Sequence, residues 1–127
     1  MKILVDTHVF LWAITGDQRL TKKHQALWLD ESSELYLSVA SVWEILIKAG
    51  LGKLPLPVPH TSYLFKQVEK NRLSWLGLRA AHFTELESLP PIHRDPFDRM
   101  LVAQARAEKM PVMTVDPLLR RYGARIL

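Results

Sequence analysis

The stretch Ile3-Leu4-Val5-Asp6 decides how the rest of the chain is interpreted, because three strand-forming apolar residues end abruptly at an acid. A short apolar run of this kind is typical of a strand that is buried on both faces of a parallel sheet. The arrangement recurs near the C-terminus, where Val112-Met113-Thr114-Val115 is followed by Asp116-Pro117. Both runs therefore predict central strands that deliver an acid to one edge of a sheet.

Helices are predicted between these strands from amphipathic spacing and from residues that begin or end helices. We expect helices between Asp6 and Gly16, after Leu20, and over about 38–49, 61–71, 79–89 and 96–109, with further strands near 35–37, 73–76 and 124–127. Gly50 is expected to end the third helix in the left-handed conformation, and the second helix is expected to turn Ala26, Leu27 and Leu29 inward. The alternation predicts one α/β domain over residues 1–127, with a mostly parallel sheet flanked by helices on both faces.

Composition limits the kind of protein that this chain can be. The 127 residues are 48% apolar, carry a formal charge of +4 and include no cysteine, so disulfides, thiolate metal sites and cysteine nucleophiles are excluded. The apolar N-terminus is interrupted by Asp6 and His8, and no run approaches the roughly 20 apolar residues that span a bilayer. We expect a soluble, cytoplasmic protein that does not enter the membrane, with a weak preference for anionic partners.

Four acids are expected at the carboxyl edge of the predicted sheet, where helix N-termini also point. They are Asp6, Glu44, Asp98 and Asp116. Taken singly, such acids are also explained as helix caps, since Ser41-Val42-Trp43-Glu44 fits a capping box and Asp95 and Asp116 each precede a proline.

Capping does not require four acids to gather at one edge. Two carboxylates about 4 Å apart repel by roughly 4 kcal/mol at an effective dielectric near 20, so a cluster indicates a cation. Oxygen-only ligation suits hard divalent ions such as Mg²⁺ or Mn²⁺, and such ions commonly serve phosphoryl chemistry. The pattern predicts a metal site.

Four segments together resemble the PIN-domain endoribonucleases, most closely the VapC-type toxins of toxin-antitoxin pairs. These segments are Leu4 to Trp12, Ser38 to Ile45, His93 to Ala105, and Thr114 to Pro117. The resemblance covers nearly the whole chain and implies a PIN fold with Mg²⁺- or Mn²⁺-dependent hydrolysis of RNA phosphodiester bonds. It assigns Asp6, Glu44, Asp98 and Asp116 to the metal-binding and catalytic quartet.

Several neighbouring residues have more than one reading. Asp95 either caps the helix or supplies or orients a ligand, and the cap is favoured. Thr7 and Thr114 either orient carboxylates or bond local backbone. His8 and His93 either contact phosphate or act in proton transfer, or they are structural or merely exposed, and the latter is favoured for each. The basic residues that either contact phosphate or are simply solvated are Arg94, Arg99, Lys48, Lys53, Arg120 and Arg121.

The resemblance also implies partners, namely an RNA substrate, a cognate antitoxin and a second copy in a homodimer. The antitoxin is expected to wrap a groove near the first helices, which would explain Leu11, Trp12, Leu27 and Trp28 if they are exposed. The four tryptophans either stack bases or serve the core or an interface.

The sequence disfavours two other classes of protein. A receiver or aspartyl phosphatase also places an acid after a parallel strand, but here the first strand ends in a single acid and no lysine follows residues 112–115. A PIN-like module that binds RNA or protein without cleaving it is disfavoured by the complete acidic quartet.

Overall fold

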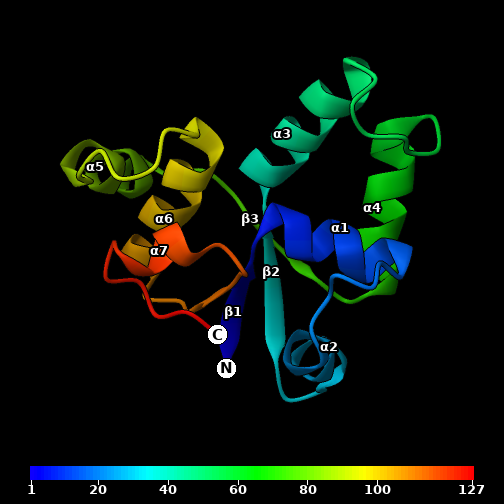
Figure 1. Ribbon diagram of the computed structural model, residues 1–127, viewed down its shortest axis with the longest axis horizontal. Coiled ribbons are helices and arrows are strands. Elements are labelled where there is room, and N and C mark those ends of the chain that lie inside the picture. Colours follow the sequence, from blue (N-terminus) through cyan, green and yellow to red (C-terminus); the bar gives the residue numbers. More distant parts are fainter.

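The computed structural model describes residues 1–127 and shows a parallel sheet between two groups of helices (Figure 1). The strands are β1 (Lys2–Val5), β2 (Glu34–Ser38), β3 (Ser74–Leu76) and β4 (Val112–Met113), in the order β3-β2-β1-β4. The helices are α1 (Thr7–Thr15), α2 (Lys22–Leu29), α3 (Val39–Gly50), α4 (His60–Lys70), α5 (Ala80–Ser88), α6 (Pro96–Glu108) and α7 (Pro117–Arg120). The predicted α/β class and parallel sheet are confirmed.

Side chains of β1 alternate between two separate cores, because successive residues of a strand point to opposite faces. Ile3 and Val5 belong to the core beneath α1, α3 and α4, whereas Leu4 belongs to the core beneath α6. All three are completely buried. Burial on both faces accounts for the uninterrupted apolar run that the sequence shows here.

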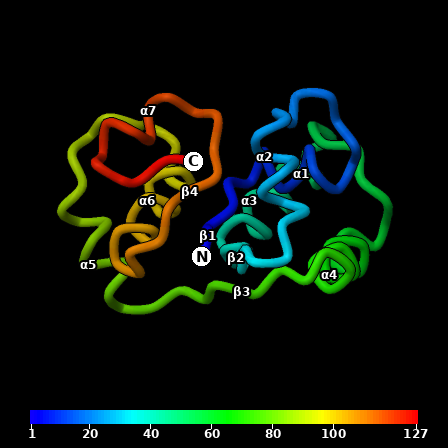
Figure 2. Tube along the Cα trace, turned by 90° about the horizontal axis from the view of Figure 1, so that it is seen from below, coloured from blue at the N-terminus to red at the C-terminus, as the bar shows by residue number.

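The view along the sheet separates the same two groups of helices (Figure 2). Helices α1 to α4 lie on one side of β1, and α5 to α7 lie on the other, with the two termini close to β1 and β4. Because all strands are parallel, their carboxyl ends share one edge, and α1, α3 and α7 each begin within a few residues of that edge. None of the helices is long and apolar enough to cross a membrane.

The inward face predicted for α2 is correct for Leu27 and wrong for Ala26 and Leu29. Leu29 is 69% exposed and Ala26 is also exposed, whereas Leu27 and Trp28 are partly buried against the core. The buried residue of α2 is His24, whose Nε2 lies 2.7 Å from the carbonyl oxygen of Leu127. A contact with the far end of the chain thus sets the orientation of this helix.

Three local details also differ from expectation. Helix α3 continues through Gly50, and the left-handed glycine is Gly52 at φ 72°. The N-cap of α3 is Ser38, whose Oγ accepts from the amide of Ala40, so Ser41 and Glu44 do not form a capping box. The predicted strand over 124–127 is reduced to one parallel bridge, between Ile126 and Val112.

Candidate metal centre

The structure brings the four predicted acids together. The charges of Glu44 and Asp116 both act on Asp6, and those of Asp6, Glu44 and Asp95 act on Asp98. Burial is the largest cause in each case, and it raises the pKa of Asp6 and raises the pKa of Asp98 to about 7. Acids with raised pKa values, close enough to repel one another, form a site that favours a bound cation.

Asp6 occupies the N-cap position of α1 but its side chain makes no capping bond. The residue is only 3% exposed, and Oδ2 accepts a hydrogen bond of 2.6 Å from the Thr114 hydroxyl. Oδ1 is buried and has no partner. A buried carboxylate oxygen without a donor is costly, and the capping interpretation therefore does not explain Asp6.

Glu44 is similarly buried and similarly incomplete. It is 2% exposed, Oε2 accepts from the Lys48 ammonium at 2.6 Å, and Oε1 has no partner. Lys48 lies one turn further along α3, so the pair follows the i, i+4 spacing of helices. One oxygen of this carboxylate remains available to a cation.

Asp95 is a helix cap, as the sequence predicted, and Asp116 is also a helix cap, the alternative that the sequence left open for it. Asp95 accepts from the amides of Phe97 and Asp98 at 2.8 and 3.3 Å. Asp116 accepts from the amide of Leu118 through Oδ1 at 2.9 Å, but its second oxygen is directed elsewhere. Asp98 makes no capping bond of its own and is therefore free, like Asp6 and Glu44, to take part in a metal site.

His93 joins two of the acids, a role that the sequence did not indicate. Its Nε2 lies 2.9 Å from Oδ2 of Asp116 and 3.3 Å from Oδ2 of Asp98, while Nδ1 accepts from the amide of Asp95 at 3.0 Å. Because Nδ1 is an acceptor, this hydrogen-bond network places the proton on Nε2. His93 thus donates toward the acids, and in this tautomer it is not a metal ligand, although His93, Asp98 and Asp116 lie within reach of one ion.

The accessory residues separate into those that touch the centre and those that do not. Thr114 orients Asp6 and also accepts from the amide of Asp116 at 3.0 Å. Thr7 instead donates to Ser41 at 2.8 Å and contacts no acid through this hydroxyl. Arg99 donates to the carbonyl oxygen of Pro90 at 3.0 Å, which ties it to the loop before α6.

Four basic residues of the predicted rim are exposed on the surface: Lys53, Arg94, Arg120 and Arg121. None of the four pairs with an acid of the centre, and their contact with phosphate stays a prediction.

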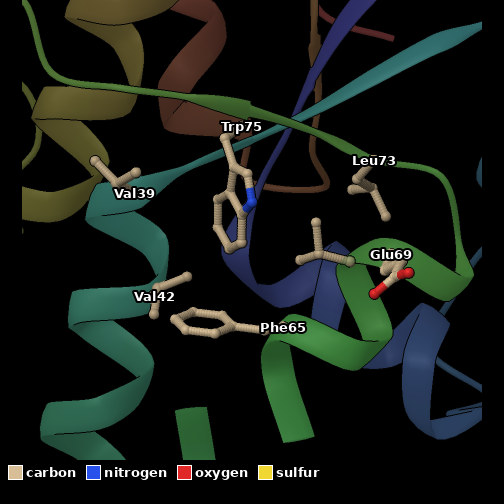
Figure 3. Close-up of a pocket in the computed structure, with 7 residues that line it drawn as sticks. Val39, Val42, Phe65, Glu69, Leu73 and Trp75 are labelled. Carbon is tan, nitrogen blue, oxygen red and sulfur yellow. The ribbon is translucent and has the colours of Figure 1, made fainter. Parts of the chain in front are cut away.

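An apolar groove of about 620 Å³ lies between α3, α4 and β3 (Figure 3). Trp75 and Phe65 meet edge to face in it, with ring centroids 5.7 Å apart, and Glu69 is its one charged residue. Leu11, Trp12, Leu27 and Trp28 do not form an exposed patch, because Leu11 is buried and the others are partly buried, so they need no partner to explain them. The exposed apolar surface lies on the α3, α4 and β3 side instead.

The chain matches a known protein family. The sequence profile of the PIN domain matches residues 3–125. The chain belongs to the PIN domain family. This assignment confirms the resemblance seen in the sequence.

Among individual proteins, the PIN domain described here is 40% identical over 99 residues to Ribonuclease VapC16 of Mycobacterium tuberculosis. The match covers 78% of this chain and 57% of that protein, so the chain spans little more than half the length of this relative.

Solved structures share the fold at lower sequence identity. The VapBC2 structure from Rickettsia felis, bound to a DNA fragment from its promoter, matches with a TM-score of 0.76 at 16% identity, covering 100% of this chain and 98% of that one. FitAcB from Neisseria gonorrhoeae matches with a TM-score of 0.67 at 19% identity, covering 98% and 96%. At these identities the likeness concerns the fold alone.

Proposed function

We propose that this PIN domain, comprising residues 1–127, is a Mg²⁺- or Mn²⁺-dependent endoribonuclease and the toxin of a toxin-antitoxin pair that acts in the cytoplasm. The observation that carries the proposal is the pair of buried, unpartnered carboxylate oxygens, Oδ1 of Asp6 and Oε1 of Glu44, within one acidic cluster. Family membership and the relative called a ribonuclease support the same reaction class.

The donor set fits a hard divalent ion. Asp6, Glu44, Asp98 and Asp116 offer only oxygen atoms, which Mg²⁺ and Mn²⁺ prefer. Such an ion supplies charge neutralisation for a phosphate and lowers the pKa of a bound water. We assign direct ligation chiefly to Asp6 and Asp98, since neither carboxylate is occupied by capping.

The remaining groups of the centre position these ligands and hold protons. Thr114 keeps one oxygen of Asp6 in place, which directs the other toward the cluster. Lys48 does the same for Glu44 and partly offsets the repulsion between acids. His93 holds a proton at Nε2 and directs it toward Asp98 and Asp116, which orients these two carboxylates.

The direct test uses a labelled RNA with purified protein in excess chelator, in Mg²⁺ and in Mn²⁺. Cleavage is expected only with metal, and Asp6→Asn should abolish it while circular dichroism stays unchanged. The matched control is Glu87→Gln, an exposed acid on α5 outside the centre. Equal cleavage in excess chelator would overturn the mechanism. Sequencing RNA ends after controlled expression in cells then identifies the target.

A homodimer and an antitoxin are the protein partners in this proposal. Solved structures with the same fold include toxin-antitoxin assemblies such as VapBC2, and exposed apolar surface on this chain extends from the groove to Trp43, which is 60% exposed. Light scattering of the purified chain tests the dimer. Co-expression with a neighbouring small gene, followed by co-purification and relief of growth arrest, tests the antitoxin; a chain that stays monomeric and unbound argues against both.

A further inference from the structure

A pocket of about 410 Å³ opens beside the acidic centre, between α1, α3 and residues 53–56. Thr7 and His8, which directly follow Asp6, line it, and so does Lys48, whose ammonium pairs with Glu44. The pocket therefore adjoins the acidic centre. Its volume lies within the range of about 300–1,000 Å³ that small-molecule sites occupy.

Three planar side chains follow one another along this pocket. The rings of His8 and Trp12 lie 6.2 Å apart and are tilted by 45°, at the i, i+4 spacing of α1. The guanidinium of Arg19 lies 5.1 Å from the centre of the Trp12 ring. Flat, partly cationic groups in series are the surfaces on which single-stranded RNA stacks its bases.

Arg19 is held in position before any ligand binds. Its Nε and Nη2 donate to the two oxygens of Asp17 at 3.1 and 2.7 Å, and this paired bond lowers the pKa of Asp17 to about 2. The Arg19 side chain nevertheless remains 70% exposed. A guanidinium that is fixed on one side and open on the other offers a preorganised stacking face.

The walls and the charged lining of the pocket differ in chemistry. The walls are apolar and comprise Leu11, Ile45, Leu54 and Leu56. The charged lining comprises three cations, Arg19, Lys48 and Lys53, and one acid, Asp17, which pairs with Arg19. Apolar walls suit a nucleobase, and the cations suit the phosphates on either side of it.

Neither of two other pockets combines these features. The apolar groove beneath Trp75 has Glu69 and no cation, so it repels phosphate. The pocket of about 450 Å³ beside Asp116 has Lys23 and Arg120 but lacks tryptophan, tyrosine and phenylalanine. Stacking groups, cations and contact with the acids occur together only in the α1–α3 pocket among these three.

We propose that the α1–α3 pocket binds a nucleobase of the RNA strand next to the cleaved phosphodiester, with Trp12 and Arg19 as its stacking groups. The proposal rests on the ribonuclease function proposed above and adds to it a determinant of the cleavage position. Selectivity follows because the base beside the cut must enter a pocket of defined shape before the phosphate reaches the acids.

The test compares Trp12→Leu and Arg19→Gln with Phe83→Leu, a matched change of an exposed aromatic residue on α5. Each change is placed in the non-cleaving Asp6→Asn protein, and binding of fluorescein-labelled adenylate, cytidylate, guanylate and uridylate pentamers is measured by anisotropy. Loss of one stacked base weakens binding by about 5- to 100-fold. We expect that loss for Trp12→Leu and Arg19→Gln with the tightest pentamer, and no loss for Phe83→Leu.

Cleavage mapping gives the second readout. On a random-sequence RNA the unmodified protein is expected to show a base preference at a fixed distance from the cut, which Trp12→Leu flattens while melting temperature and metal dependence persist. If the protein cuts RNA and both pocket variants bind and cut as it does, the proposal is overturned. It is equally overturned if the variants lose only a co-purified protein partner, whereas absence of any metal-dependent cleavage by the unmodified chain counts against the ribonuclease function itself.

Discussion

Replacing Asp98 with asparagine is expected to stabilise the chelated protein at pH 8 while removing its response to divalent ions. Asp98 lies in the first turn of α6, and burial together with the charge of Asp6 raises its pKa from 3.8 to about 7. The folded state therefore holds the Asp98 proton more tightly than the unfolded state does. Stability from this group is greatest below about pH 4, falls as the pH rises toward 7, and then remains low.

The size of the effect follows from the displacement of the pKa. Each pKa unit corresponds to about 1.4 kcal/mol, so keeping Asp98 ionised at pH 8 costs the folded state up to roughly 4 kcal/mol. Solvent and side-chain relaxation reduce such electrostatic costs, and we expect about 2 kcal/mol to be measured. For a domain of this size that corresponds to a melting temperature about 6–10 °C higher in Asp98→Asn.

The assay is urea and thermal unfolding by circular dichroism at pH 4, 6 and 8, first in chelator and then in Mn²⁺. The unmodified protein should gain about 2.7 kcal/mol when Mn²⁺ reaches 100 times its dissociation constant, and Asp98→Asn should gain nothing. Glu87→Gln, the exposed acid of α5, is the matched control and should follow the unmodified protein throughout. A chelated Asp98→Asn protein no more stable than the unmodified one at pH 8 would refute the reasoning.

Three further predictions concern the groups around the ligands. Asp95→Asn should reduce RNase rate and metal affinity less than Asp98→Asn, because asparagine also caps helices; the reverse order would exchange their assigned roles. Thr114→Val removes the hydrogen-bond donor to Asp6, which raises the pKa of Asp6 further. Metal affinity measured by calorimetry at pH 6 should therefore fall about 10-fold or more. Lys48→Met leaves the buried Glu44 carboxylate without a counter-charge, so the free energy of unfolding in chelator should fall by about 1–2 kcal/mol. Mn²⁺ should restore most of that loss, and an unchanged urea midpoint would contradict the prediction.

Local signals in the sequence account for several features of the centre. The apolar run Ile3-Leu4-Val5 is typical of a doubly buried strand. The caps formed by Asp95 and Asp116 involve amides two or three residues away. Such bonds depend on the short segment that contains them. They are therefore predictable without knowledge of the rest of the fold.

Interactions between distant segments were not predictable in this way. The predicted capping box of Ser41 and Glu44 is wrong because Ser38 ends β2 and caps α3. The Ser38 hydroxyl also donates to Gln104 of α6 at 2.6 Å. The bridging role of His93 depends on how the loop before α6 lies against the start of α7, 23 residues later in the chain. Nothing in the local sequence around either residue reports these contacts.

The sequence by itself determined that Asp6 and Asp116 follow the carboxyl ends of parallel strands, because strand burial and chain direction fix which end of each strand an acid follows. Only the tertiary structure decided which of those acids are helix caps and which are free, since that depends on where each carboxylate points. It leaves Oδ1 of Asp6 and Oε1 of Glu44 buried without donors, 38 residues apart in sequence, and this pairing exists only when α1 and α3 meet at the edge of the sheet.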